Sequence, residues 1–149
     1  MKKEHQEIIN QLIIEIEKLI PVYMQNEEDR SKANGNVALC IIDNDGFVSG
    51  KVFGTDKIRA RECFRVAWTK ASQVWITGMP TGEFEKCVFN NEIDEATHGI
   101  RKPDYIGWLG GQPVTLNDGT IFSVGFSGFR GVTDIEIVTK ALSIVNQKL

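Results

Sequence analysis

Two tight-turn signals between short apolar runs constrain the fold of this chain more than any other feature. D-N-D-G occupies 43–46 and N-D-G occupies 117–119, each between strand-like residues. Asp-Gly pairs favour the turns of β-hairpins, so antiparallel strands are expected on both sides of each turn. A sheet built from hairpins excludes a doubly wound parallel fold. The expected strand pairs are 37–42 with 47–53, and 114–116 with 120–127.

Helical periodicity accounts for most of the remaining chain. Apolar residues recur every three or four positions through residues 1–24, which predicts an amphipathic helix that ends near Pro21. The same spacing predicts a long helix over 56–77 and a shorter one over 81–91. Near the end of the chain, Thr133-x-x-Glu136 matches a capping box and predicts the start of a last helix.

One more apolar run completes the expected sheet. Residues 105–109 read Y-I-G-W-L, and their aromatic and β-branched side chains are typical of a strand. Residues 25–36 and 92–104 are polar and are expected to be surface loops. The predicted fold class is therefore α+β, with a mostly antiparallel five-stranded sheet flanked by helices.

Length and composition predict one soluble domain over residues 1–149. The chain is 42% hydrophobic and 25% charged, with a formal net charge of -3, which argues against a general nucleic-acid binder. Polar residues such as Glu15 and Lys18 interrupt the first apolar stretch, so neither a signal peptide nor a membrane span is expected. A cytoplasmic location follows. Three widely spaced cysteines and two histidines predict free thiols and no metal site.

The entry into the last helix is a candidate anion site. The segment 127–132 is glycine-rich and leads to a helix N-terminus, where free N–H groups and the helix dipole favour negative charge. Arg130 would strengthen such a site. Alternatively, the glycines only permit tight turns, and Asp134 itself neutralises the helix end.

The central helix carries an excess of positive charge, which either meets an anionic ligand or is a solvated face. Nearby aromatic residues could wall an apolar pocket or could serve as core and interface anchors. His5 and His98 could act as axial ligands or proton donors, although a single loop histidine is commonly a surface residue. The cations are Lys57, Arg59, Arg61, Arg65 and Lys70, and the aromatics are Trp68, Trp75, Trp108, Phe126 and Phe129.

Several short patterns are informative in their order and spacing. Near the C-terminus they are G-G-x-P-V at 110–114, D-G at 118–119 and G-x-S-G at 125–128, followed by Asp134, and upstream they are A-L-x-I-x-D-x-x-G at 38–46 and A-x-x-K-A at 67–71. Together these patterns resemble the GlcG-like family of small haem-binding proteins, with 38–46 similar to the family's first hairpin and 67–71 to its central helix.

This resemblance implies a profilin-like fold, haem or corrinoid binding, and assembly into homo-oligomers. It also implies that an N-terminal histidine, here His5, would be the haem ligand. The chain departs from the family pattern where Phe129 and Arg130 replace further glycine. The residues expected to bind the ligand are Lys70, Gly110, Gly111, Pro113, Ser127, Gly128, Arg130 and Asp134.

Three functional hypotheses follow. The first is a small-molecule-binding protein for haem, another tetrapyrrole or a carboxylate ligand, with cations on the acid groups and aromatics on the apolar face. The second is an enzyme of small-acid metabolism, an isomerase or lyase, that uses Lys70, Asp134 or His98 as acid and base. The third is an oligomerising accessory subunit that makes protein contacts through its Trp residues and first helix.

Overall fold

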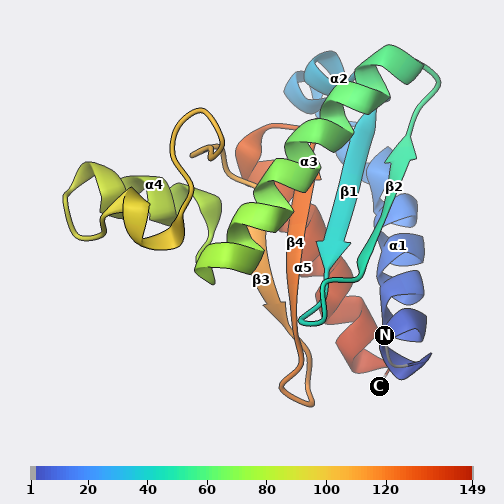
Figure 1. Cartoon of the computed structure of the whole chain (residues 1–149). Coiled ribbons are helices and arrows are strands. Elements are labelled where there is room, and N and C mark those ends of the chain that lie inside the picture. The colour runs from blue at the N-terminus through green and yellow to red at the C-terminus, as the bar shows by residue number, and fades with distance from the viewer. Residues whose placement is uncertain (1–2, 149) are drawn as a thin grey trace.

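A computed structural model describes residues 3–148 and shows an antiparallel sheet with helices on both faces (Figure 1). Helix α3 crosses one face, whereas α1 and α5 lie together on the other. A 3₁₀ turn at Glu95–His98 lies within the segment expected to be a loop. The other elements are α1 (Lys3–Tyr23), α2 (Glu27–Ala33), β1 (Val37–Ile42), β2 (Val48–Phe53), α3 (Lys57–Thr77), α4 (Thr81–Phe89), β3 (Gly111–Thr115), β4 (Ile121–Ser127) and α5 (Gly131–Gln147).

The sheet has four strands in the order β2-β1-β4-β3, and every neighbouring pair is antiparallel. The α+β class and both predicted hairpins are confirmed, but the prediction of five strands is wrong. Residues 105–109 do not form a strand. The backbone of this segment is hydrogen-bonded by a side chain of α3 instead. The Gln73 side chain accepts from Ile106 N at 2.8 Å and donates to Ile106 O at 2.9 Å. These bonds take the place of a neighbouring strand.

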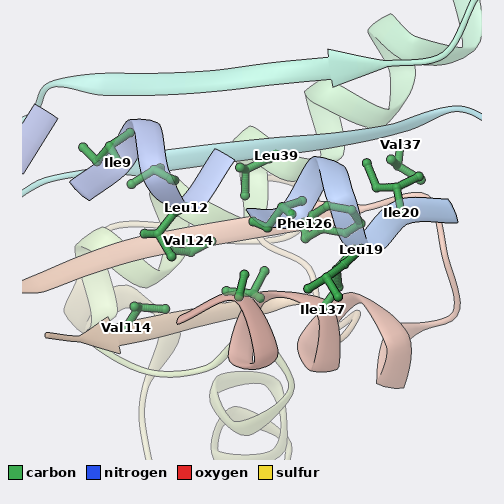
Figure 2. Packing of buried hydrophobic residues seen from close by; sticks show 14 of the residues in the cluster. Ile9, Leu12, Leu19, Ile20, Val37, Leu39, Val114, Val124, Phe126 and Ile137 are labelled. Atoms are coloured by element: carbon green, nitrogen blue, oxygen red, sulfur yellow. The ribbon is translucent and has the colours of Figure 1, made fainter. Parts of the chain in front are cut away.

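Alternate residues of the central strands face different helices. Val37, Leu39 and Ile41 of β1 belong to the cluster formed with α1 and α5, as do Phe122, Val124 and Phe126 of β4. Figure 2 shows side chains of α1, β1, β4 and α5 meeting in this cluster. The opposite cluster is built from smaller side chains: Ala38, Cys40, Ile42, Cys63, Ala67 and Ala71.

Small residues let α3 lie very close to the sheet. A Cβ placed on Gly125 of β4 would overlap the backbone carbonyl of Ala67 in α3. Because that neighbour is backbone rather than a flexible side chain, any larger residue at this position would push the helix away. Ala67 and Ala71 are themselves fully buried at this contact. The close contact between Gly125 of β4 and the backbone of α3 therefore sets the distance between this helix and the sheet.

The stretch expected to be a loop at 25–36 contains α2. Asn26 caps this helix by accepting a hydrogen bond from Asp29 N at 3.1 Å, and Asn34 ends it in the left-handed conformation at φ 47°. Helix α1 also extends past its expected end near Pro21 to Tyr23. The sequence contains the Asn26 cap and the acidic first turn of α2, but the segment has too few apolar residues to show a helical stripe.

The last helix begins earlier than the capping box predicted. Helix α5 starts at Gly131 with Arg130 as its N-cap. Thr133 does not cap the helix: its hydroxyl donates to Asp29 Oδ2 of α2 at 2.8 Å. A carboxylate from another helix therefore occupies the place that the local Thr and Glu were expected to fill.

Two properties of residues 3–148 bear on the candidate sites. None of the helices in this part of the chain has the length and apolar character needed to cross a bilayer. The same residues contain no group of three or more His, Cys, Asp or Glu side chains placed to hold a metal ion. The three cysteines are free thiols, and Cys40 and Cys63 are buried.

Candidate functional site

A cavity of about 540 Å³, here called the inner cavity, lies at the C-terminal end of β4. Its walls come from α2, α3, the segment before β3, and the entry into α5. Four of the residues predicted to bind the ligand line it, namely Lys70, Ser127, Gly128 and Asp134. The full lining is Lys32, Arg59, Glu62, Cys63, Val66, Lys70, Gly107, Trp108, Leu109, Ser127, Gly128, Phe129, Gly131 and Asp134.

A buried ion pair lies in the wall of the inner cavity. Lys70 Nζ donates to Asp134 Oδ2 at 3.3 Å and to the carbonyl of Phe126 at 2.8 Å. Both charged side chains are only 3% exposed. Asp134 Oδ1 also accepts from Phe129 N at 3.0 Å, so this carboxylate meets a backbone N–H at the entry into α5.

Burial shifts the titration of both members of the pair toward their neutral forms. Desolvation raises the pKa of Asp134 to about 7, although Lys70 and the N–H of Phe129 oppose the shift. Desolvation likewise lowers the pKa of Lys70, against the attraction of Asp134. Burial therefore brings the pKa values of this lysine and this carboxyl group closer together than they are in water.

The glycine pair at the start of β3 packs behind this ion pair rather than lining the cavity. Gly110 has φ 116°, and a Cβ there would lie 2.6 Å from Phe126 O and 2.7 Å from Lys70 Nζ. A Cβ on Gly111 would lie 3.1 Å from Lys70 Cβ. Both glycines are therefore needed for close packing around Lys70.

Arg130, the predicted anion-binding residue, is bound within the protein. Its Nε and Nη2 donate to Asp29 Oδ1 and Oδ2, both at 3.1 Å, and its backbone N donates to Oδ1 at 3.0 Å. Burial alone would raise the pKa of Asp29, but hydrogen bonds from Arg130 and Thr133 outweigh it and lower the pKa. Arg130 is absent from the cavity lining given above, so its charge serves to join α2 to α5.

Two exposed cations border the inner cavity instead. Lys32 comes from α2 and Arg59 from the first turn of α3. Arg59 Nη2 donates to the carbonyl of Lys32 at 2.9 Å, which leaves other guanidinium donors for a ligand. Sequence reasoning included Arg59 among the basic residues of the central helix but missed Lys32. The Asn26 cap and the Asn34-Gly35 terminus would have revealed the helix that positions it.

A second cavity of about 620 Å³, here called the tryptophan cavity, lies between α3 and the segment 100–108. Trp68, Trp75 and Trp108 line it; Trp68 and Trp75 are about half exposed, and Trp108 is 64% exposed. Val66 and Trp108 line both cavities. The two hollows therefore adjoin, one bordered by cations and the other by indole rings. Phe126 is fully buried in the core and lines neither.

The remaining predicted residues lie elsewhere. The His5 ring lies 3.3 Å from Thr120 Oγ1 and packs edge-on against Phe122, near the start of β4 and thus at the opposite end of this strand from the inner cavity. His98 packs edge-on against Phe84 of α4. Pro113 lies in β3 opposite Ser123. None of the three lines the inner or the tryptophan cavity.

No protein-family model matches the chain, and no curated protein is similar enough in sequence to count as a relative. Solved structures define its fold class nonetheless. The DUF336 protein ORFY of Klebsiella pneumoniae matches 96% of this chain and 90% of its own, at 20% identity and TM-score 0.66. The expected resemblance to GlcG-like proteins is thus confirmed in the fold.

Two further neighbours share the fold, and one of them is a haem complex. The PduOC:heme complex matches 94% of this chain and 93% of its own, at 17% identity and TM-score 0.64. The protein HbpS matches 91% of this chain and 86% of its own, at 17% identity and TM-score 0.55. At these identities the likeness concerns the fold, and the profilin-like assignment stays a prediction.

Proposed function

We propose that this protein binds a flat, amphipathic, carboxylate-bearing molecule, with haem or another tetrapyrrole as the best candidate. The ligand would lie across the two adjoining cavities. Its acid groups would meet Lys32 and Arg59 at the inner cavity, and its ring would lie against Trp108 and the tryptophan cavity.

The single observation that carries this proposal is the shared wall of the two cavities. Trp108 and Val66 line both the inner cavity, which Lys32 and Arg59 border, and the tryptophan cavity. Ligand sites of this kind combine extensive apolar lining with a few polar groups that fix orientation. The fold likeness to the PduOC:heme complex supports the same ligand class.

The residues present fit the acid groups and the ring of a tetrapyrrole better than they fit its iron. Neither cavity is lined by a histidine of the described chain, and His5 lies at the far end of β4. We therefore propose that recognition rests on the carboxylates and the ring. Axial ligation of the iron by His5 or His98 stays a prediction.

The decisive experiment compares haemin with metal-free protoporphyrin IX, by absorbance for haemin and by fluorescence for the porphyrin. Both are expected to saturate the protein at micromolar concentration with affinities within about tenfold of each other, since the iron adds little. Binding of haemin alone would contradict recognition through the ring and acid groups. Failure of both would refute the tetrapyrrole proposal.

Matched charge variants locate the acid groups. Arg59→Glu is expected to weaken haemin binding by about fivefold or more, because a loss of ~1 kcal/mol is typical for one exposed charge contact. Arg61→Glu is the control, since Arg61 lies in the same helix outside both cavities. Equal losses in the two variants would indicate only a general charge effect.

An aromatic variant tests the other half of the site. Trp108→Ala is expected to weaken haemin binding by more than Arg59→Glu does, because Trp108 walls both cavities. Phe89→Ala removes an aromatic residue that is 84% exposed and outside both cavities. Binding that survives the loss of Trp108 would place the ligand elsewhere.

Assembly and location remain parts of the proposal. We propose a cytoplasmic homo-oligomer whose contacts involve the half-exposed indoles of Trp68 and Trp75. The first helix contributes less than expected, because its apolar stripe is already buried against α5 and the sheet. Light scattering of the protein with and without haemin tests both the assembly and its dependence on ligand.

A second function is favoured by one specific contact. The small-acid enzyme hypothesis required two ionisable side chains within hydrogen-bond reach in a cavity. Lys70 and Asp134 satisfy that requirement at 3.3 Å, whereas His98 lies apart against Phe84. An acid–base reaction in the inner cavity would therefore use the Lys70–Asp134 pair.

A further inference from the structure

Lys70 differs from every other lysine among residues 3–148, because it alone is buried. It is nevertheless one of the residues that line a cavity large enough for a small organic acid. The Phe126 carbonyl accepts one of the Nζ hydrogens at 2.8 Å and holds the nitrogen in place. A fixed amine on a cavity-lining residue, with a carboxyl group 3.3 Å away, is an arrangement suited to nucleophilic chemistry.

The surroundings of Lys70 lower the pKa of its amine, chiefly through burial. Desolvation and the positive charge of Lys32 lower the pKa of Lys70, while Asp134 and Cys63 act in the opposite direction. A desolvated lysine beside a second cation is a known means of obtaining a reactive amine at neutral pH. Asp134, whose pKa burial raises to about 7, can hold the proton that such chemistry must move.

We propose that Lys70 forms an imine with a small 2-oxo acid bound in the inner cavity. The neutral Lys70 nitrogen attacks the ketone carbon, a C–N bond forms, and the carbonyl electron pair moves to oxygen. The Asp134 carboxylate accepts one proton from the nitrogen and passes it to the oxygen, which gives a carbinolamine. Asp134 then passes the second N–H proton to the hydroxyl, which leaves as water while the nitrogen lone pair completes the C=N bond. One ketone and one amine thus yield one imine and one water, with no oxidant or reductant.

The cations that border the cavity select the acid. Lys32 and Arg59 both line it, and the charge of Lys32 acts on Lys70 and Asp134 alike. A ligand carboxylate held by these cations would lie at the opening while the adjacent ketone carbon faced Lys70. This covalent chemistry goes beyond reversible tetrapyrrole binding and uses only the inner cavity. It is therefore tested without haemin.

Borohydride trapping of the wild-type protein tests the proposal directly. The protein is incubated with pyruvate, reduced with sodium borohydride, digested, and mapped by mass spectrometry. One reduced pyruvate adduct is expected at Lys70, with labelling that saturates as the pyruvate concentration rises. The exposed lysines, such as Lys51, are internal controls in the same sample. Acetone, which has the ketone but no carboxylate, is expected to label Lys70 at least tenfold less.

The outcomes separate this inference from the proposed function. No adduct at Lys70, or labelling that rises linearly with pyruvate and follows lysine exposure, would overturn the imine proposal whether or not haemin binds. Equal labelling by acetone would overturn the selection of a 2-oxo acid. Asp134→Asn is expected to slow trapping at least tenfold in protein whose circular dichroism is unchanged. If that variant does not fold, mapping of the wild-type adduct still decides the case.

Discussion

The two faces of the sheet are built from side chains of different size, and the difference separates stability from chemistry. On the α1 and α5 face, large residues such as Phe126 and Ile137 are fully buried (Figure 2). On the α3 face, Ala, Cys and Gly predominate. Both proposed ligand cavities are lined by α3. The densely packed face holds the fold together, and the small-residue face leaves space for a ligand.

Loss of a large side chain on the first face should have the largest effect. Phe126→Ala is expected to lower the free energy of unfolding by about 3 to 5 kcal/mol, because Phe126 is fully buried and stacks on Phe129. Urea unfolding followed by circular dichroism measures the change. Phe47→Ala, at a side chain that is 49% exposed, should cost under ~0.5 kcal/mol. Similar losses in both variants would contradict the assignment of the core to this face.

Addition of one methyl group to the other face should have the next largest effect. Gly125→Ala is expected to cost about 3 kcal/mol, because the new Cβ would overlap the Ala67 carbonyl and push α3 outward. Because α3 lines both cavities, its outward movement should also weaken haemin binding. Ser123→Ala, on the same face of β4, adds no atom and is the control. A stable Gly125→Ala protein would show that α3 is not held against the sheet.

The bond between α2 and α5 should contribute less, and its contribution should depend on pH. Asp29→Asn is expected to cost about 2 kcal/mol at pH 7, since a carboxylate that accepts from Arg130 and Thr133 loses its charge. The folded pKa of Asp29 is lowered, so its contribution is present above the pKa of an unfolded aspartate and is lost as pH falls through the folded value.

The difference in stability between wild type and Asp29→Asn, measured by urea unfolding, should therefore shrink below about pH 4. Glu28→Gln is the control, because the Glu28 side chain is 76% exposed and lies 3.6 Å from Arg130. A difference that stayed constant down to pH 2 would show that the charge of Asp29 does not stabilise the fold.

Asp134 should show the opposite dependence on pH. Its folded pKa is raised to about 7, against about 3.9 in an unfolded chain. Between these values the folded state binds more protons, so the contribution of Asp134 to stability falls as pH rises. The stability of wild type relative to Asp134→Asn is therefore expected to decrease from pH 4 to pH 8 in urea unfolding. Asp104→Asn, at an exposed residue, should show no such trend. An increase in this stability difference with pH would mean that the attraction of Lys70 outweighs burial and lowers the pKa of Asp134.

Most elements could be predicted because their signals are local. The apolar stripes of α1 and α3 and the turn at 117–119 depend on near neighbours in the sequence, and the structure confirms each. The strand prediction for the Y-I-G-W-L run was wrong because the side chain of Gln73 takes the hydrogen bonds of the Ile106 backbone. Gln73 lies 33 positions before Ile106 in the sequence. No local pattern could show that a glutamine would replace a strand.

The candidate site, like the fold, was predictable only in part. Lys70, Ser127, Gly128 and Asp134 were expected together from the family resemblance, and the structure brings them to one cavity. Arg130 was expected to face a ligand, but Asp29, 101 positions earlier, binds it. Lys32 was missed because α2 was missed. The charges at the cavity thus depend on which long-range ion pairs form, and composition does not determine that.

The pairing of α1 with α5 has a practical consequence for every binding measurement described above. The beginning of α1 and the end of α5 lie together on the side of the sheet away from α3 (Figure 1). A fluorophore, biotin or sensor-chip tether attached there is separated from both hollows by the whole thickness of the β-layer. Oriented immobilisation through either terminus should therefore leave ligand access unobstructed.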